Sequence, residues 1–217
     1  MHPRALPFAL VTALTLTITN PHAGGWAVVT VENLPEQFVV GKPTTLTFSV
    51  RQHGMHLLPG LRAHASANLR DKQIDATAGP ARESGYYTAS FTLPEPGRWT
   101  ISIESGFGAS GLTLMPIEAV AASATPTPVP IATRGQQLFI AKGCNTCHAH
   151  GDTRARPMSP VGVDLTDKRY TDGLLAKILQ DPSLVQPTGI WRMPNLNLNP
   201  QEISALVAFI NKPRTRP

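Results

Sequence analysis

Two cysteines and a histidine carry the clearest chemistry in this sequence of 217 residues. Cys144 and Cys147 are the only cysteines, and His148 follows them directly in the order Cys-x-x-Cys-His. Thiols at this spacing can form thioethers with two vinyl groups on one edge of a haem, and the next residue then lies beneath the iron. The motif therefore predicts one covalently bound haem c, with the His148 imidazole as the proximal iron ligand.

Two other chemistries use similar residues. A thioredoxin-like dithiol places its Cys-x-x-Cys in a βαβ context, whereas this motif follows a predicted helix. A structural metal site needs a second pair of ligands, and His150 alone does not complete four. The two cysteines are also too close in sequence to form a disulfide framework.

The iron needs a sixth ligand or an open position, and Met193 is the best candidate. It lies in the segment Trp191-Arg192-Met193-Pro194, in a proline-rich loop between two predicted helices. Ligation by histidine and methionine raises the reduction potential and suits electron transfer. Met158, in another loop, is the alternative ligand. Three side chains could approach the haem propionates: Arg169, Trp191 and Arg192.

The elements that would position these ligands are helices. Thr133 can cap a helix over 134–142, and Thr171 can cap a second one that ends at Asp181-Pro182. Asn199 begins a third helix, because Pro200 stands at its first position and Glu202 can reach back to form a capping box.

The preceding part of the chain reads as strands. Alternating apolar residues predict strands over 44–50, 87–93 and 99–103, and 28–31 and 112–117 look like further strands. Six or seven short strands in this span predict an antiparallel, Ig-like β-sandwich over 24–117. Small residues and prolines over 118–133 predict an exposed spacer before the helical domain, 134–217.

The helical domain resembles the class I monohaem cytochrome c domain. Landmarks that carry the resemblance, besides the haem motif, are Gly135, Leu138, Phe139, Lys142, Gly143, Asp164-Leu165, Met193-Pro194 and the helix over 202–210. The resemblance implies an all-α cytochrome c fold, in which Gly135 and Phe139 cross the last helix near Leu206 and Phe209. One landmark differs: the family often has Gly-Pro after the haem motif, and the proline carbonyl accepts a bond from the proximal histidine. Here Gly162 precedes Val163, which leaves open which carbonyl replaces it.

The β-rich part contains a group of soft ligands. His53, Met55 and His56 lie close together in sequence, with His64 beyond, and such side chains suit copper outside the cytoplasm. In an unbroken strand His53 and Met55 would share a face. The alternative is a loop with histidines and no metal.

This part also resembles small exported β-sandwich domains of the YtkA/FixH-like group. The segments that carry the resemblance lie within about 35–105, namely Phe48 to Gly54, Gly60-Leu61, Gly85 to Tyr87 and Pro96 to Thr100. The resemblance implies a link to the assembly of respiratory oxidases or to their copper supply.

Residues 1–23 predict a signal peptide, because Arg4 precedes an apolar run that Asn20 and Pro21 interrupt. An uncleaved membrane anchor is the alternative, and both place the protein in the periplasm or elsewhere outside the cytoplasm. The net charge of +5 arises mainly from residues 134–217, with 11 Lys/Arg and 6 Asp/Glu, and could steer an acidic partner or an anionic surface.

The sequence indicates no nucleic-acid-binding pattern, and no nucleophile–base or carboxylate pair indicates an enzyme. The leading hypothesis is an exported electron carrier whose β-sandwich docks a redox partner protein, such as an oxidase, reductase or dehydrogenase. The second is a metal-handling or assembly factor for a respiratory oxidase, with copper bound by the β-sandwich. The third is a subunit of an enzyme whose catalytic centre lies on another chain.

Overall fold

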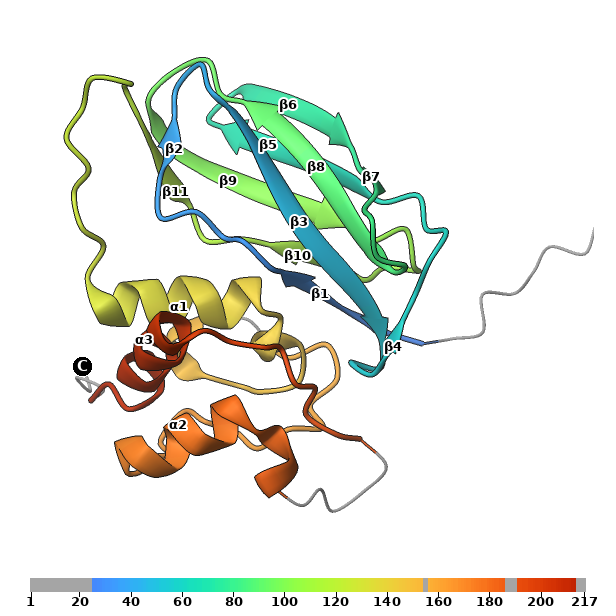
Figure 1. The fold of residues 1–217 in the computed structure, drawn as a ribbon, viewed down its shortest axis with the longest axis vertical. Coiled ribbons are helices and arrows are strands. Elements are labelled where there is room, and N and C mark those ends of the chain that lie inside the picture. Colours follow the sequence, from blue (N-terminus) through green and yellow to red (C-terminus); the bar gives the residue numbers. More distant parts are fainter. Residues whose placement is uncertain (1–24, 154–155, 186–190, 214–217) are drawn as a thin grey trace, which may run out of the picture.

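The computed structural model describes residues 25–153, 156–185 and 191–213. The predicted signal peptide over 1–23 lies outside these residues. Strands occupy the first part of the described chain and helices the second, as the sequence predicts (Figure 1). None of the described helices is both long and apolar enough to cross a membrane.

The strands form two sheets that stack face to face (Figure 1). One sheet has the order β1-β3-β8-β7, with β4 added beside β3, and the other has the order β2-β11-β9-β5-β6, with β10 beside β9. The bounds in the first sheet are β1 Ala27–Val31, β3 Pro43–Gln52, β4 His56–Leu57, β7 Gly79–Pro80 and β8 Tyr86–Thr92. Those in the second are β2 Phe38–Val39, β5 His64–Leu69, β6 Lys72–Thr77, β9 Gly97–Glu104, β10 Gly111–Thr113 and β11 Ile117–Val120.

The predicted alternation sets the core between these sheets. In β3, Leu46, Phe48 and Val50 are fully buried, and in β9 the buried set starts at Trp99 and continues at every second residue. Alternate side chains of a strand point to one face, so each sheet contributes one apolar face to a shared core.

Three features of the β-rich part differ from the prediction. The hairpin of β5 and β6 was not predicted, and its inward residues include the small side chains of Ala65 and Ala67. The segment predicted as one strand over 112–117 is divided between β10 and β11. Finally, β2 pairs with β11 in parallel, whereas the other strand pairs are antiparallel.

The helices are α1 Ile131–Ala141, α2 Asp172–Gln180 and α3 Pro200–Ile210. The first begins earlier than predicted: Pro130 is the N-cap residue and its carbonyl accepts a bond from the Arg134 amide, so Thr133 lies inside the helix. The start of α3 is confirmed, since Asn199 and Glu202 form the capping box. Residues 121–130 separate β11 from α1, within the spacer predicted over 118–133.

Gly135 sets the crossing of α1 and α3, as the resemblance to cytochrome c domains implies. A Cβ atom at this position would lie 1.9 Å from the carbonyl oxygen of Ala205 and 2.6 Å from the Cβ of Phe209. One turn further along, the ring centroids of Phe139 and Phe209 are 5.5 Å apart. Only a glycine allows the two helix backbones to approach this closely.

The β-sandwich packs directly on α1. The Arg134 guanidinium donates to the carbonyls of Leu34 and Pro35, at 2.6 and 3.1 Å. At the other end of α1, the buried Lys142 ammonium donates to the carbonyl of Glu32 at 3.0 Å. These bonds hold the chain after β1 against both ends of α1, so the two parts of the chain share more than a linker.

Candidate functional site

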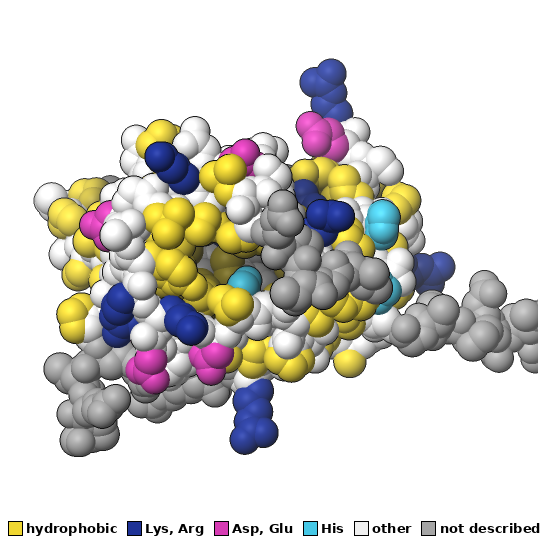
Figure 2. Space-filling view, turned by 90° about the horizontal axis from the view of Figure 1, so that it is seen from below, with side chains coloured by type: hydrophobic (Ala, Val, Ile, Leu, Met, Phe, Trp, Pro, Cys, Tyr) yellow, Lys and Arg dark blue, Asp and Glu magenta, His cyan; other side chains and the backbone are white. Residues whose placement is uncertain are grey.

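The predicted haem ligands line one cavity, which lies between the helices and the edge of the β-sandwich. Its volume is about 470 Å³, and Cys144, Cys147, His148 and Met193 are among its lining residues. Figure 2 shows a hollow on this face of the molecule, surrounded by hydrophobic side chains and with a histidine at its edge. A cavity of this size can enclose most of a compact organic ligand.

The haem motif begins at the end of α1, where the chain changes direction. Gly143 has a left-handed φ of 75°, and the short 3-10 helix η1 follows at Cys144–Thr146. The His148 amide then donates to the carbonyl of Cys144 at 2.9 Å. This compact turn directs both thiols and the imidazole toward the same cavity.

His148 has its ring orientation fixed by the backbone. Its Nδ1 lies 2.9 Å from the carbonyl oxygen of Val163. A carbonyl can only accept, so Nδ1 carries the proton and Nε2 keeps the lone pair that a metal needs. Burial lowers the pKa of His148, although the bond to Val163 opposes this, and burial thus favours the neutral, ligating form. Val163 thus provides the carbonyl acceptor that a proline often provides in the class I cytochrome c family, which the helical domain resembles.

Gly162 makes room for that ring. A Cβ atom at Gly162 would lie 2.5 Å from two ring atoms of His148. The Gly162 amide also donates to the carbonyl of Cys147 at 3.1 Å, which fixes this segment against the haem motif. The close approach of backbone to ring explains why glycine occupies this position.

The surroundings of the two thiols disfavour the thiolate form. Burial raises the pKa of Cys144 to about 12, with a further contribution from the neighbouring Cys147, and burial raises the pKa of Cys147 to about 11. Reactive cysteines need a lowered pKa, because the thiolate is the nucleophile. The environment therefore argues against redox exchange between the two cysteines.

The two candidate methionines lie in different places. Met193 lines the cavity and packs against the core, whereas Met158 is half exposed and has its sulfur 4.0 Å from the Ser110 hydroxyl. Of the three side chains considered for the propionates, Trp191 and Arg192 line the cavity. Arg169 is exposed, and its guanidinium donates to the carbonyl of Lys168.

Four lining residues come from the β-sandwich: Trp26, Val28, His53 and Gly54. The sequence predicted none of them at the haem site, and His53 only as a copper ligand. They lie at the start of β1 and in the turn that follows β3. The contact is close, because a Cβ atom at Gly143 would lie 2.4 Å from a methyl carbon of Val28. Contacts between segments this distant in sequence cannot be predicted from the local sequence pattern of either segment.

The proposed copper ligands are distributed over one turn and both sheets. His53 and Met55 belong to a turn, not to a strand, because His53 and Gly54 both have left-handed φ values, of 53° and 74°. His53 faces the cavity, His56 is exposed in β4, and His64 lies in the other sheet, 3.2 Å from Asp75. Among the described residues, no three His, Cys, Asp or Glu side chains are grouped to hold a metal.

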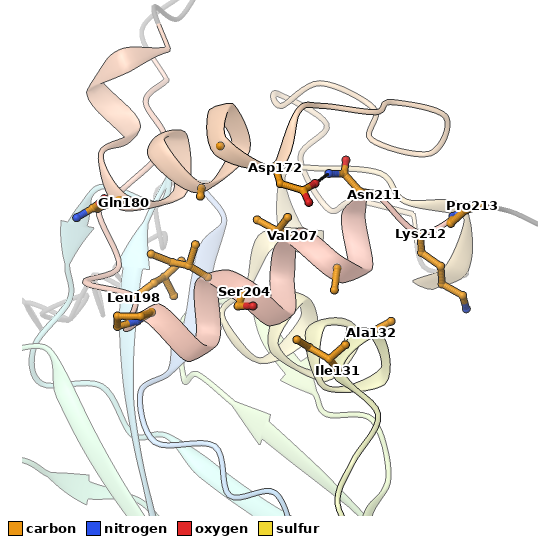
Figure 3. Close-up of a pocket in the computed structure, with 15 residues that line it drawn as sticks. Ile131, Ala132, Asp172, Gln180, Leu198, Ser204, Val207, Asn211, Lys212 and Pro213 are labelled. Atoms are coloured by element: carbon orange, nitrogen blue, oxygen red, sulfur yellow. Dashed lines mark hydrogen bonds between the residues drawn. The ribbon is translucent and has the colours of Figure 1, made fainter.

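A second hollow, of about 1040 Å³, lies along another face of α3 (Figure 3). Apolar side chains such as Leu198 and Val207 line it, and at one end Asn211 donates to the Asp172 carboxylate at 2.8 Å. Its lining contains no cysteine, histidine or methionine. The hollow therefore offers no ligand suited to a haem iron.

The residues of the first cavity fit a haem c. Two thiols have the Cys-x-x-Cys sequence spacing that suits the two vinyl groups, a neutral imidazole presents Nε2, and Met193 supplies a thioether. The remaining lining is mostly apolar, which suits a porphyrin.

Comparison with solved structures gives only distant likenesses. The Lin-41 filamin domain is 20% identical over 46% of this chain and 86% of that one, with a TM-score of 0.32. Domains 4 and 5 of the S-layer protein SbsC are 18% identical over 43% and 44%, at 0.33. The superoxide reductase (neelaredoxin) from Ignicoccus hospitalis is 13% identical over 43% and 80%, at 0.30. TM-scores this low carry no argument about function.

Comparison by sequence is informative for the helical part. No curated protein matches the chain significantly. Residues 132–213 match the family model described as Cytochrome c, and this range contains α1 except its first residue, the haem motif, α2 and α3. The C-terminal part of this chain is therefore a cytochrome c domain, preceded by a β-rich part.

Proposed function

We propose that this protein is an exported electron carrier that would hold one haem c through thioethers at Cys144 and Cys147, with His148 and Met193 as the residues that would ligate the iron. The observation that carries the proposal is the convergence of these four side chains on one largely apolar cavity. When bound, haem supplies an iron that exchanges single electrons between its ferrous and ferric states.

The protein's own residues account for the rest of the chemistry. Val163 keeps the His148 proton on Nδ1, so that Nε2 stays available for the iron. Met193 supplies a soft, neutral ligand that raises the reduction potential. Apolar side chains such as Leu175 and Leu206 limit the access of water to the cavity.

The partner is proposed to be another redox protein outside the cytoplasm, such as an oxidase, reductase or dehydrogenase. The positive charge of residues 134–217 supports an acidic partner surface, because opposite charges steer diffusional encounter. The β-sandwich is proposed to contribute to this docking. Copper handling has no comparable support: His56 and His64 lie in different sheets, and among the described residues no three His, Cys, Asp or Glu side chains are grouped to hold a metal.

The test is spectroscopic, on protein produced with a working haem-maturation system. The Cys144→Ala, Cys147→Ala double variant should lose its haem to acid–acetone extraction, whereas the unaltered protein should keep it. Met193→Ala should lose the weak red absorption band that a thioether ligand gives to ferric haem. Met158→Ala is the matched control and should keep the band.

Three outcomes would contradict the proposal. A colourless mature protein would exclude haem attachment altogether. Haem retention by the double variant would exclude the thioethers. Loss of the red band in Met158→Ala but not in Met193→Ala would show that Met158, and not Met193, is the iron ligand.

A further inference from the structure

Three aromatic rings meet at the edge of the haem cavity, and two of them belong to the β-sandwich. The ring centroids lie 5.5 Å apart for Trp26 and His53, 5.8 Å for Trp26 and Trp191, and 4.8 Å for His53 and Trp191. All three residues line the cavity. Edge-to-face and tilted contacts at these distances are favourable, so the three form one cluster, here called the aromatic clamp.

Backbone hydrogen bonds and packing fix the positions of Trp26 and His53, the two rings that belong to the β-sandwich. The His53 amide donates to the carbonyl of Trp26 at 3.0 Å, directly beyond the pairing of Ala27 with Gln52 in β1 and β3. Gly54 is buried beside Val28, and this prevents the turn from swinging away from the cavity. The side of the clamp that belongs to the β-sandwich is therefore fixed by sheet hydrogen bonds.

The third ring stands on the segment that carries Met193. Trp191 precedes the methionine by two residues, and residues 191–199 form neither helix nor strand. A segment without regular hydrogen bonding depends on side-chain packing for its position. The contacts of Trp191 with the two fixed rings thus restrict the segment next to the proposed iron ligand.

We propose that Trp26 and His53 are positioning residues for Met193: through the clamp, the β-sandwich holds the methionine segment at the cavity, where Met193 would supply an iron ligand. This inference rests on the proposed function, because it presumes that Met193 is the distal ligand. It gives the β-sandwich a part in the haem site itself, besides any part in docking. Weakening the clamp should let the methionine leave the iron more often, with the haem still covalently attached.

The experiment measures how fast added imidazole replaces the distal ligand of the ferric full-length protein. Trp26→Ala and His53→Ala should each bind imidazole about tenfold faster, on the scale of one lost ring contact. Both should also lower the reduction potential, because a weaker thioether bond favours the ferric state. Trp26→Phe and His53→Phe keep a ring at each position and should restore most of the slow rate.

His56→Ala is the matched control, because His56 is an exposed histidine of the same hairpin. It should leave the rate and the potential unchanged. The inference is overturned if Trp26→Ala and His53→Ala, with their haem attached, bind imidazole at the rate of the unaltered protein. It is also overturned if the phenylalanine variants behave like the alanine variants, since a ring would then not be what matters.

The Met193→Ala variant separates this failure from failure of the proposed function. If Met193→Ala alters the imidazole reaction and the clamp variants do not, Met193 remains the ligand and only the positioning role is lost. If Met193→Ala also has no effect, the proposed ligand itself is wrong.

Discussion

Replacing Lys142 with methionine should destabilise both halves of the molecule together. The Lys142 ammonium is almost fully buried, lies 2.9 Å from the Glu202 carboxylate in α3 and donates to the carbonyl of Glu32 in the β-rich part. Methionine fills a similar volume but removes the positive charge. The Glu202 carboxylate, whose side chain is only 14% exposed, then loses its ionic partner.

The expected loss follows from these contacts. Removing one partner of a buried ion pair costs about 3 kcal/mol at the lower end of the usual range, which applies because Glu202 keeps some access to water and its bond to the Asn199 amide. The bond to Glu32 adds about 1 kcal/mol. A loss of about 4 kcal/mol should lower the melting temperature by about 8–16 °C for a chain of this size.

The assay is urea unfolding followed by circular dichroism and tryptophan fluorescence, with Lys212→Met as the control. Lys212 lies 3.9 Å from Asp152 and its side chain is 54% exposed, so this variant should lose no more than about 0.5 kcal/mol. Adding Glu202→Gln to Lys142→Met should recover part of the loss, because the carboxylate that has lost Lys142 is then neutral, and the recovery is only partial because Glu202 also stabilises the Arg134 cation. A loss below about 1 kcal/mol in Lys142→Met would refute the reasoning.

Two further predictions concern close approaches of glycine. Gly135→Ala should cost about 3 kcal/mol, because its Cβ would meet the Ala205 carbonyl at 1.9 Å and force α1 away from α3; an unchanged melting temperature would contradict this. Gly162→Ala should turn the His148 ring, because its Cβ would lie 2.5 Å from that ring, and should shift the reduction potential of the haem protein. A reduction potential equal to that of the unaltered protein would contradict this, because it would show that the His148 ring accommodates the added methyl group without moving.

The features predicted correctly from sequence are those with local causes. The capping box at Asn199 needs only four consecutive residues, and the alternation in β3 needs only one strand. The crossing at Gly135 came from the resemblance to cytochrome c domains, which preserves information on long-range packing. In each case the sequence signal lies within the element itself or within a known family pattern.

The features that were not predicted depend on packing or backbone contacts that the local sequence pattern does not reveal. Ala65 and Ala67 are fully buried in β5, but alanine is a weak strand former and its alternation with polar residues gives little contrast. The partner of the His148 ring is a backbone carbonyl, which any residue can provide. The wall formed by Trp26 and His53 depends on how the β-sandwich packs against the helices, and that packing brings together residues more than a hundred positions apart.

This packing changes how the β-sandwich should be regarded. An accessory domain on a flexible tether would leave the haem domain complete without it, but here Val28 touches Gly143 at the haem motif and Arg134 binds two β-sandwich carbonyls. Burial lowers the pKa of Arg134, and such a buried cation is tolerated because those carbonyls and nearby carboxylates offset the loss of water. A fragment without the β-sandwich would expose this side of α1 and open the cavity beside His148. The properties of the haem site are therefore expected to depend on the β-sandwich even before any redox partner binds.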